Sequence, residues 1–139
     1  MNEQDMLRLS ACDAVAAMST GRFTALAYAE ALLSRCAERS DLNAFITLEP
    51  EAVRVAARAA DSRRTAGETL GLLHGLPIPV KDSINTADLP TTAGTAALRE
   101  FRPLAEATVV ARLRDAGAIV LGKTNLHELY FGWTSSNMA

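Results

Sequence analysis

The chain has 139 residues, of which 49% are apolar and 22% are charged, a composition typical of a folded globular protein rather than a disordered tail. Fourteen basic and sixteen acidic residues give a formal charge of −2, so neither nucleic acid nor an anionic membrane is expected as a partner. No segment approaches a membrane span, and the first residues lack a signal-peptide pattern, which predicts a cytoplasmic protein. Cys12 and Cys36 form no CxxC pair, so redox chemistry is not expected.

Helical patterns dominate the first forty residues. Ser10 and Asp13 make a capping pattern that opens a short helix, and Gly21 ends it. Thr24 caps a second helix, which continues to about Arg39 with its apolar residues on one face. The next apolar stretch, residues 43–48, is typical of a strand.

Beyond residue 50 the pattern alternates between helices and strands. Pro50 is suited to a first helical position, and Gly117 to the stop that follows a helix. Thr124 can cap a last short helix. The expected helices cover residues 50–67, 106–116 and 124–130, and the expected strands cover residues 78–81 and 118–121.

This order of elements predicts an α/β layered fold, with a helical part at residues 1–40 and the start of an α/β core at residues 41–139. The apolar strand at residues 118–121 needs cover on both faces and pairing on both edges, which so few strands hardly provide. We therefore expect an incomplete part of one larger domain. Unpaired strand edges and uncovered apolar surface also predict self-association of copies.

Residues 117–124 match the phosphate-loop pattern G-x-x-x-x-G-K-[ST] letter for letter. That loop needs a strand before its first glycine and flexible chain between its glycines. Here a predicted helix precedes Gly117, and the intervening residues are apolar and β-branched. We expect a helix stop and a strand in this segment rather than a nucleotide site.

Two other motifs fall short of a functional pattern. His127 and Glu128 begin like H-E-x-x-H, but Phe131 occupies the position of the second histidine. We therefore expect no metal. Ser135 and Ser136 lack the G-x-S-x-G elbow of a serine nucleophile, so they are interpreted as loop serines that bond to nearby backbone.

Lys81 lies where an apolar strand gives way to a loop, and Asp82 follows it. Such a position can partly bury an ammonium group beside a carboxylate. Most lysines, however, are exposed or paired with an acid on the surface. The residues alone therefore favour a salt-bridged lysine at a strand end, and they leave a catalytic role open.

Four segments together resemble the amidase signature family in their amino-acid sequences and in their order along the chain: residues 75–82, 91–95, 120–129 and 131–137. The resemblance implies an α/β/α layered domain with a mixed sheet, of which this chain is the N-terminal part. It also implies an enzyme that hydrolyses a small-molecule carboxylic amide to acid and ammonia, with no cofactor. The sequence of residues 127–135 resembles arylacetamide-type amidases more than other members of the family.

The same resemblance implies roles for individual residues. Lys81 matches the catalytic lysine of the family's Ser-cisSer-Lys triad, and Asp82 and Asn125 match positions that support the site. Tyr130 and Gly132 match positions that line the acyl pocket. A lysine that acts as a base must lose its proton near neutral pH, so we expect its amine to be largely buried and Asp82 to point elsewhere.

The Gly/Ser-rich segment that holds the family's two catalytic serines is expected some tens of residues beyond Asn137, where the sequence does not extend. The chain alone is therefore expected to be inactive, and a non-catalytic remnant or binding fragment stays open as an alternative. The family also includes amidotransferase A subunits, which act with partner chains in tRNA-dependent amidation. The N-terminal part barely separates these from stand-alone amidases.

Overall fold

A computed structural model describes residues 1–134, 136 and 137. Its α-helices are α1 (Glu3–Leu7), α2 (Ala11–Ser19), α3 (Ala25–Glu38), α4 (Pro50–Thr65) and α5 (Thr108–Asp115). Three 3-10 turns are η1 (Ser40–Leu42), η2 (Ala96–Leu98) and η3 (Glu128–Tyr130). The strands are β1 (Phe45–Thr47), β2 (Pro77–Lys81) and β3 (Ile119–Thr124). The expected α/β class is confirmed.

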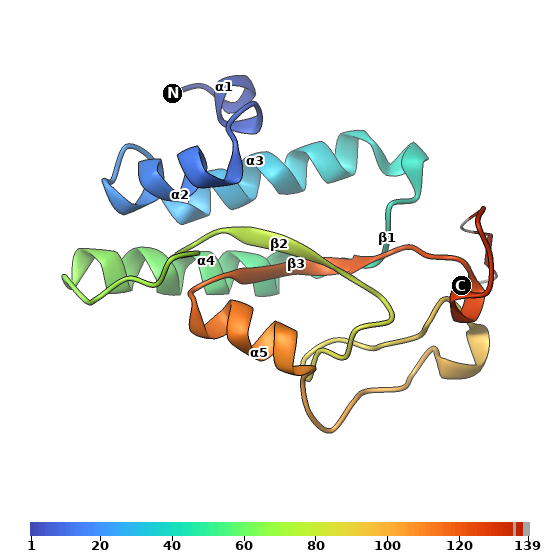
Figure 1. The fold of residues 1–139 in the computed structure, drawn as a ribbon. Helices are drawn as coiled ribbons and strands as arrows, with labels where there is room; N and C mark the ends of the chain where they lie inside the picture. Colours follow the sequence, from blue (N-terminus) through green and yellow to red (C-terminus); the bar gives the residue numbers. More distant parts are fainter. Residues whose placement is uncertain (135, 138–139) are drawn as a thin grey trace.

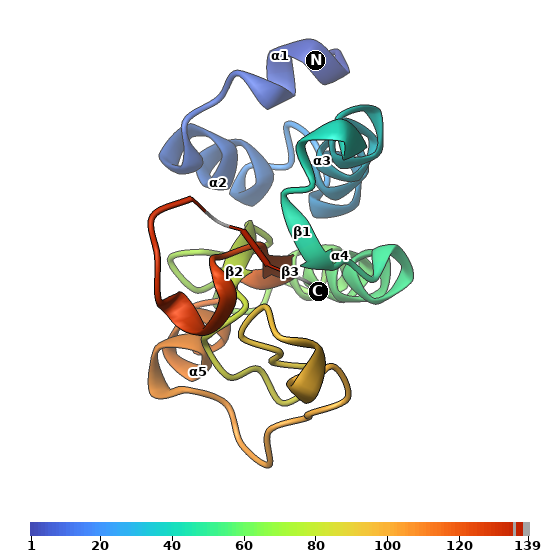
Figure 2. The same cartoon turned by 90° about the vertical axis from the view of Figure 1, so that its right-hand side faces the viewer.

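The three strands form one mixed sheet in the order β1-β3-β2. Strand β3 runs parallel to β2 and antiparallel to β1. Helices α2 and α3 lie on one side of this sheet and α5 on the other, while α4 packs against α3 and β3 (Figures 1 and 2). The main apolar core lies between α2, α3, α4 and the first half of β3.

Local capping explains why the first helices begin where they do. The Ser10 hydroxyl accepts a hydrogen bond from the Asp13 amide at 3.1 Å, and the Thr24 hydroxyl accepts one from the Ala27 amide at 3.0 Å. The carboxylate of Asp61 in α4 accepts two further bonds from the free amides at the start of α3. The caps expected from the sequence are therefore confirmed, and a tertiary contact adds to one of them.

Residues 117–124 do not form a phosphate loop. Gly117 has a left-handed φ of 94° and ends the turn after α5, and its neighbours enter β3 directly. A Cβ at this glycine would lie 2.9 Å from the backbone of His74, so the position also requires glycine for space. The expected helix stop and strand are confirmed.

The expected helix from Thr124 to Tyr130 is wrong. Thr124 is the last residue of β3, and among the described residues after it the turn η3 is the only further element. Leu129 and Tyr130 both have positive φ angles, 52° and 60°, which no regular helix allows. Pairing of Thr124 with the neighbouring strands competes with its use as a helix cap.

Helix α1, opened by an Asn2 cap, was not expected from the sequence.

Across the described ranges, no helix combines the length and the apolar character that crossing a bilayer requires.

Candidate active site at the ends of strands β2 and β3

Lys81 is the last residue of β2, at the end where the chain leaves the sheet for a long loop. Strand β2 is an edge strand among the described residues, and the Lys81 side chain is exposed. Its amine lies 5.2 Å from the centre of the Tyr130 ring. The expectation of a largely buried amine is therefore wrong for this chain, because one aromatic ring is the main group that faces it.

A second lysine lies on the neighbouring strand in the opposite environment. Lys123 of β3 pairs in register with Val80, one residue before Lys81, and its side chain is 0% exposed. Its Nζ donates to the Thr91 hydroxyl at 2.7 Å and to the Pro90 carbonyl at 3.1 Å. The charged amine of Lys123 is thus fully enclosed by protein.

The anion that faces Lys123 is Asp82, which is also 0% exposed. The Lys123 Nζ lies 3.3 Å from Oδ1 of Asp82, and that oxygen accepts no hydrogen bond from a described residue. The other oxygen, Oδ2, accepts bonds from the amide and the hydroxyl of Thr92. Burial lowers the pKa of the Lys123 amine below its ordinary value, and the Asp82 charge opposes that change.

Backbone bonds join the same residues. The Asp82 amide donates to the Thr124 carbonyl at 3.1 Å, and the Asp82 carbonyl accepts from the Ala93 amide at 3.0 Å. The Thr92 hydroxyl also accepts from the Gly94 amide at 3.1 Å. The ends of β2 and β3 and the loop at residues 90–95 are therefore one connected unit, which we call the Asp82–Lys123 network.

The expectation that Asp82 points away from Lys81 agrees with this geometry. Residues alternate between the two faces of a strand, so Val80 and Asp82 face the loop at residues 90–95 and Lys81 faces the other way. The sequence patterns did not reveal the network, because they presented Lys123 only as a phosphate-loop lysine. The available signal for the network was Lys123 itself, a charged residue inside an otherwise apolar strand.

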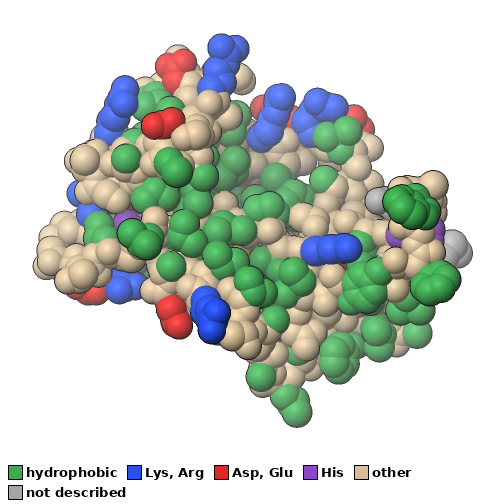
Figure 3. Space-filling model, viewed as in Figure 1, with side chains coloured by type: hydrophobic (Ala, Val, Ile, Leu, Met, Phe, Trp, Pro, Cys, Tyr) green, Lys and Arg blue, Asp and Glu red, His purple; other side chains and the backbone are tan. Residues whose placement is uncertain are grey.

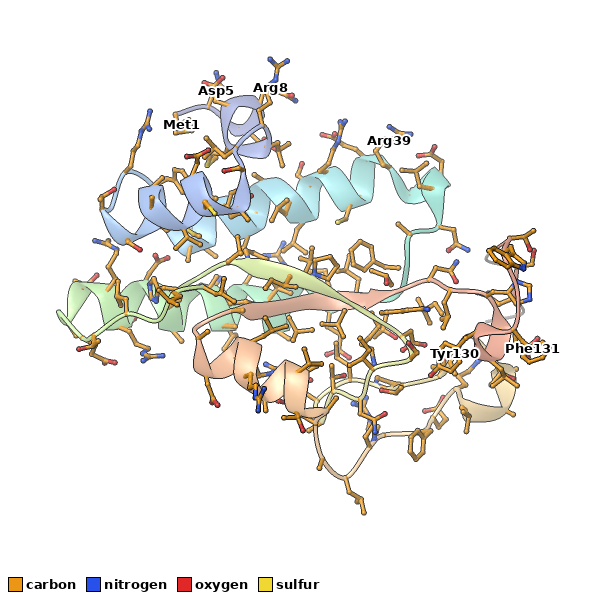
Figure 4. The ribbon with its side chains drawn as sticks, in the orientation of Figure 1. Met1, Asp5, Arg8, Arg39, Tyr130 and Phe131 are labelled. Atoms are coloured by element: carbon orange, nitrogen blue, oxygen red, sulfur yellow. The ribbon has the colours of Figure 1, made fainter. Side chains whose placement is uncertain are left out.

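The segment after β3 carries two of the expected site residues. The Tyr130 hydroxyl donates to the Ser83 carbonyl at 3.1 Å, which holds the ring beside Lys81. Figure 4 shows Tyr130 and Phe131 at one end of the sheet. Gly132 packs so closely on the His127 ring that no room is left for a Cβ at this position. Tyr130 is thus brought to Lys81, whereas Gly132 meets another side chain.

Asn125 follows β3 and connects it to the first strand. Its Nδ2 donates to the Asn43 carbonyl at 2.9 Å, and its Oδ1 accepts from the Leu126 amide at 2.8 Å and from the Asn137 side chain. These bonds support the loop beyond β3 rather than contact Lys81. Ser136 is exposed in the same loop, and Ser135 lies outside the described residues.

The described ranges contain no group of three or more histidine, cysteine, aspartate or glutamate side chains arranged to hold a metal ion. A hollow of about 560 Å³ lies between the end of α3 and β1, lined by residues that include Cys36, Leu42 and Phe45. Lys81 and Lys123 are not among its lining residues. The hollow is therefore separate from the candidate site.

The sequence and the fold of this chain were compared with those of known proteins. The sequence model of the Amidase family matches residues 27–139. The A subunit of the glutamyl-tRNA(Gln) amidotransferase from Chloroflexus aurantiacus is 44% identical over 136 residues. That match covers 97% of this chain and 28% of the relative, so the chain spans little more than a quarter of that protein.

Solved structures agree with the sequence matches. The native peptide amidase from Stenotrophomonas maltophilia is 42% identical, with a TM-score of 0.80, over 87% of this chain and 25% of its own. A structure described as an amidase is also 42% identical, with a TM-score of 0.85, over 93% of this chain and 30% of its own. The resemblance found in the four sequence segments is confirmed, and the chain belongs to the Amidase family.

Proposed function

We propose that this chain supplies the lysine base of an amidase site, which splits a small-molecule carboxylic amide into acid and ammonia by a Ser-cisSer-Lys mechanism. The position of Lys81 is the observation that carries the proposal. It ends a parallel strand, and no carboxylate among the described residues pairs with its amine. Ligands of α/β proteins commonly bind at such strand ends.

The chemistry explains why an unpaired lysine matters. An amide is a poor electrophile with a poor leaving group, so its hydrolysis needs an activated nucleophile, an oxyanion site and a proton for the departing nitrogen. In this proposal Lys81, which is exposed in residues 1–139, is covered by the rest of the domain, and its neutral amine takes a proton from a bridging serine. The bridging serine takes one from the nucleophilic serine, which attacks the amide carbonyl. The same path returns the proton to the departing nitrogen, and water then releases the acid from the serine ester.

The proposal assigns supporting roles to four further residues. Asp82 and Asn125 hold the ends of β2 and β3, as their hydrogen bonds suggest. Tyr130 and Gly132 line the acyl pocket, and the ring of Tyr130 already lies next to the Lys81 amine. Phe131 and Trp133 are 93% and 102% exposed, and hydrophobic side chains gather at this end of the molecule (Figure 3). This surface is suited to contact with an apolar acyl group or with further protein.

The proposal also treats residues 1–139 as the N-terminal part of a single larger domain, because the chain spans 28% of a curated relative. The two catalytic serines would then come from residues beyond this sequence. The chain alone is expected to release no ammonia from aryl or aliphatic amides. General acid–base help by itself contributes about 10²–10⁴-fold, which is far below enzyme-scale acceleration.

An amidotransferase A subunit is the second candidate function. The curated relative that is 44% identical carries that name, whereas the peptide amidase structure is 42% identical, so both kinds of protein are similarly near. The names favour a multi-chain assembly in the first case and a stand-alone hydrolase in the second. Hybrids with each parent distinguish them by the fraction of the parent's activity that is kept.

A hybrid protein tests the proposal directly. Residues 1–139 replace the aligned quarter of the Stenotrophomonas maltophilia peptide amidase, and release of ammonia from that enzyme's own amide substrate is followed. We expect Lys81→Met to lower kcat/KM by about 10²–10⁴-fold, the range for loss of a general base. Arg58→Ala, which removes an exposed cation of α4, is the matched control and should leave the rate unchanged.

Two outcomes would contradict the proposal. A folded hybrid that keeps more than a tenth of its activity after Lys81→Met does not use this lysine as its base. Turnover by the 139-residue chain alone, abolished by Lys81→Ala, would instead assign the nucleophile to a serine of this chain such as Ser136. A hybrid that folds but is inactive in every form favours the non-catalytic alternative.

A further inference from the structure

The fourteen basic residues of this chain comprise twelve arginines and two lysines, Lys81 and Lys123. The two lysines lie on adjacent parallel strands at neighbouring register positions. One amine is exposed beside an aromatic ring, and the other is wholly buried against a carboxylate. This arrangement makes the proposed base and the buried cation close neighbours through the sheet.

Asp82 creates a problem for a lysine base. It is the next residue after Lys81, and its carboxylate lies on the other face of the strand, about 10 Å from the Lys81 amine. A buried, uncompensated carboxylate at that distance still favours the protonated form of a lysine, which cannot accept a proton. Asp82 is fully buried, so water does not screen its charge. Some other group must cancel it.

Lys123 is placed to do so. Its Nζ is 3.3 Å from Oδ1 of Asp82, and the same amine is fixed by the Thr91 hydroxyl and the Pro90 carbonyl. Asp88 is the other acid whose charge acts on Lys123. On the opposite face the Tyr130 ring faces Lys81. No further charged side chain among the described residues is paired with either lysine.

We propose that Lys123 is a positioning residue for Lys81, which cancels the charge of Asp82 and ties the end of β2 to the loop at residues 90–95. The inference rests on the proposed function, because it concerns Lys81 as the base. Lys123 touches no reacting atom in this scheme. It acts through Asp82, whose backbone fixes the point at which Lys81 leaves the sheet.

A buried ion pair is by itself weak evidence for a contribution to stability, because the cost of removing two charges from water offsets their attraction. An apolar pair of the same size would hold the strands as well. An apolar pair would also be neutral, but it would lack the hydrogen bonds that Thr92 in the loop donates to the Asp82 carboxylate. The network therefore secures geometry and charge balance at one point.

Acylation of Lys81 in the 139-residue chain tests the inference without any enzyme activity. The folded chain is treated briefly at neutral pH with an amine-selective acetylating reagent, and Nα-acetyl-lysine is the internal competitor. Peptide mass spectrometry then gives the rate at Lys81, which depends on the fraction of neutral amine. Because the chain has two lysines and one is buried, the signal is easily assigned.

The decisive variant is Lys123→Gln, which keeps a polar side chain that can donate hydrogen bonds but carries no charge. We expect acylation of Lys81 to slow by about two- to fivefold, as for a unit charge about 10 Å away in surroundings of intermediate dielectric. The double variant Asp82→Asn with Lys123→Gln removes both charges, and the rate should return to that of the parent. A purely structural role would not produce this recovery.

Three results would overturn the inference. The first is an acylation rate of Lys81 in folded Lys123→Gln that equals the rate in the parent. The second is a double variant that is acylated as slowly as Lys123→Gln. The third is slower acylation of Lys81 that occurs only when the Lys123→Gln chain is unfolded. If Lys123→Gln does not fold, the double variant alone decides, since a folded double variant that is more than twofold slower than the parent contradicts charge balance. Failure of Lys81→Met to affect the hybrid amidase would refute the proposed function and leave these rates unaffected.

Discussion

The two lysines of this chain show how surroundings decide what one kind of side chain can do. Lys81 ends an edge strand, is exposed, and faces the Tyr130 ring. Lys123 lies one register position away in the central strand and is enclosed with Asp82. The first amine is open to contact with another molecule. The second donates to Thr91 and Pro90 and is paired with Asp82, so it holds these groups together.

The largest expected difference between the two lysines is in stability. Lys123→Met leaves the Asp82 charge buried without a partner, which should lower the free energy of unfolding by about 3–5 kcal/mol. Lys81→Met changes an exposed side chain and should shift that free energy by no more than about 0.5 kcal/mol. Urea denaturation of the 139-residue chain, followed by circular dichroism, measures both.

The matched control for this comparison is Asp82→Asn with Lys123→Met, which removes both charges and should recover most of the loss. Similar losses for Lys81→Met and Lys123→Met would mean that the two environments do not differ in the way the structure indicates.

A smaller effect is expected in the pH dependence of stability. The pKa of Lys123 is lowered by burial, so the folded chain binds fewer protons there than the unfolded chain between the lowered value and the ordinary one of about 10.4. The contribution of Lys123 to stability is therefore fully present above about pH 10.4 and is lost as the pH falls through the lowered value.

Urea midpoints between pH 8 and 10.5 measure this effect. The free energy of unfolding of the parent, relative to the variant Asp82→Asn with Lys123→Met, should rise with pH by at most about 1.4 kcal/mol per unit. The reference removes the effects of Tyr28 and Cys36, whose pKa values are raised by burial in both proteins. A relative stability that falls with pH would reverse the sign and contradict the burial of Lys123.

The smallest expected effect concerns the other lysine. The Tyr130 ring attracts the Lys81 ammonium group, with about 0.5–1 kcal/mol for an exposed cation–π contact. Tyr130→Ala should therefore speed acylation of Lys81 by about two- to fivefold. Tyr130→Phe keeps the ring and loses the bond to the Ser83 carbonyl, so it separates the two contributions. Equal acceleration in both variants would assign the effect to the lost hydrogen bond.

Most of the fold could be predicted from local patterns. The caps at Ser10 and Thr24 and the proline at position 50 each mark a helix that the structure contains. The glycine stop at Gly117 is also present. The last expected helix failed because Thr124 belongs to β3, where pairing with two neighbours outweighs its value as a cap. Such pairing involves residues far away in the sequence, and no local pattern reports it.

The sequence by itself determined the family, the α/β class and the place of Lys81 at a strand end, because each of these depends on local spacing and on the order of four segments. Only the tertiary structure decided which lysine is buried. Burial of an amine depends on what packs against it, and the partners of Lys123 come from residues 82, 90 and 91. Those residues meet Lys123 because β2 and β3 are parallel neighbours, a relation that alternation along a single strand cannot reveal.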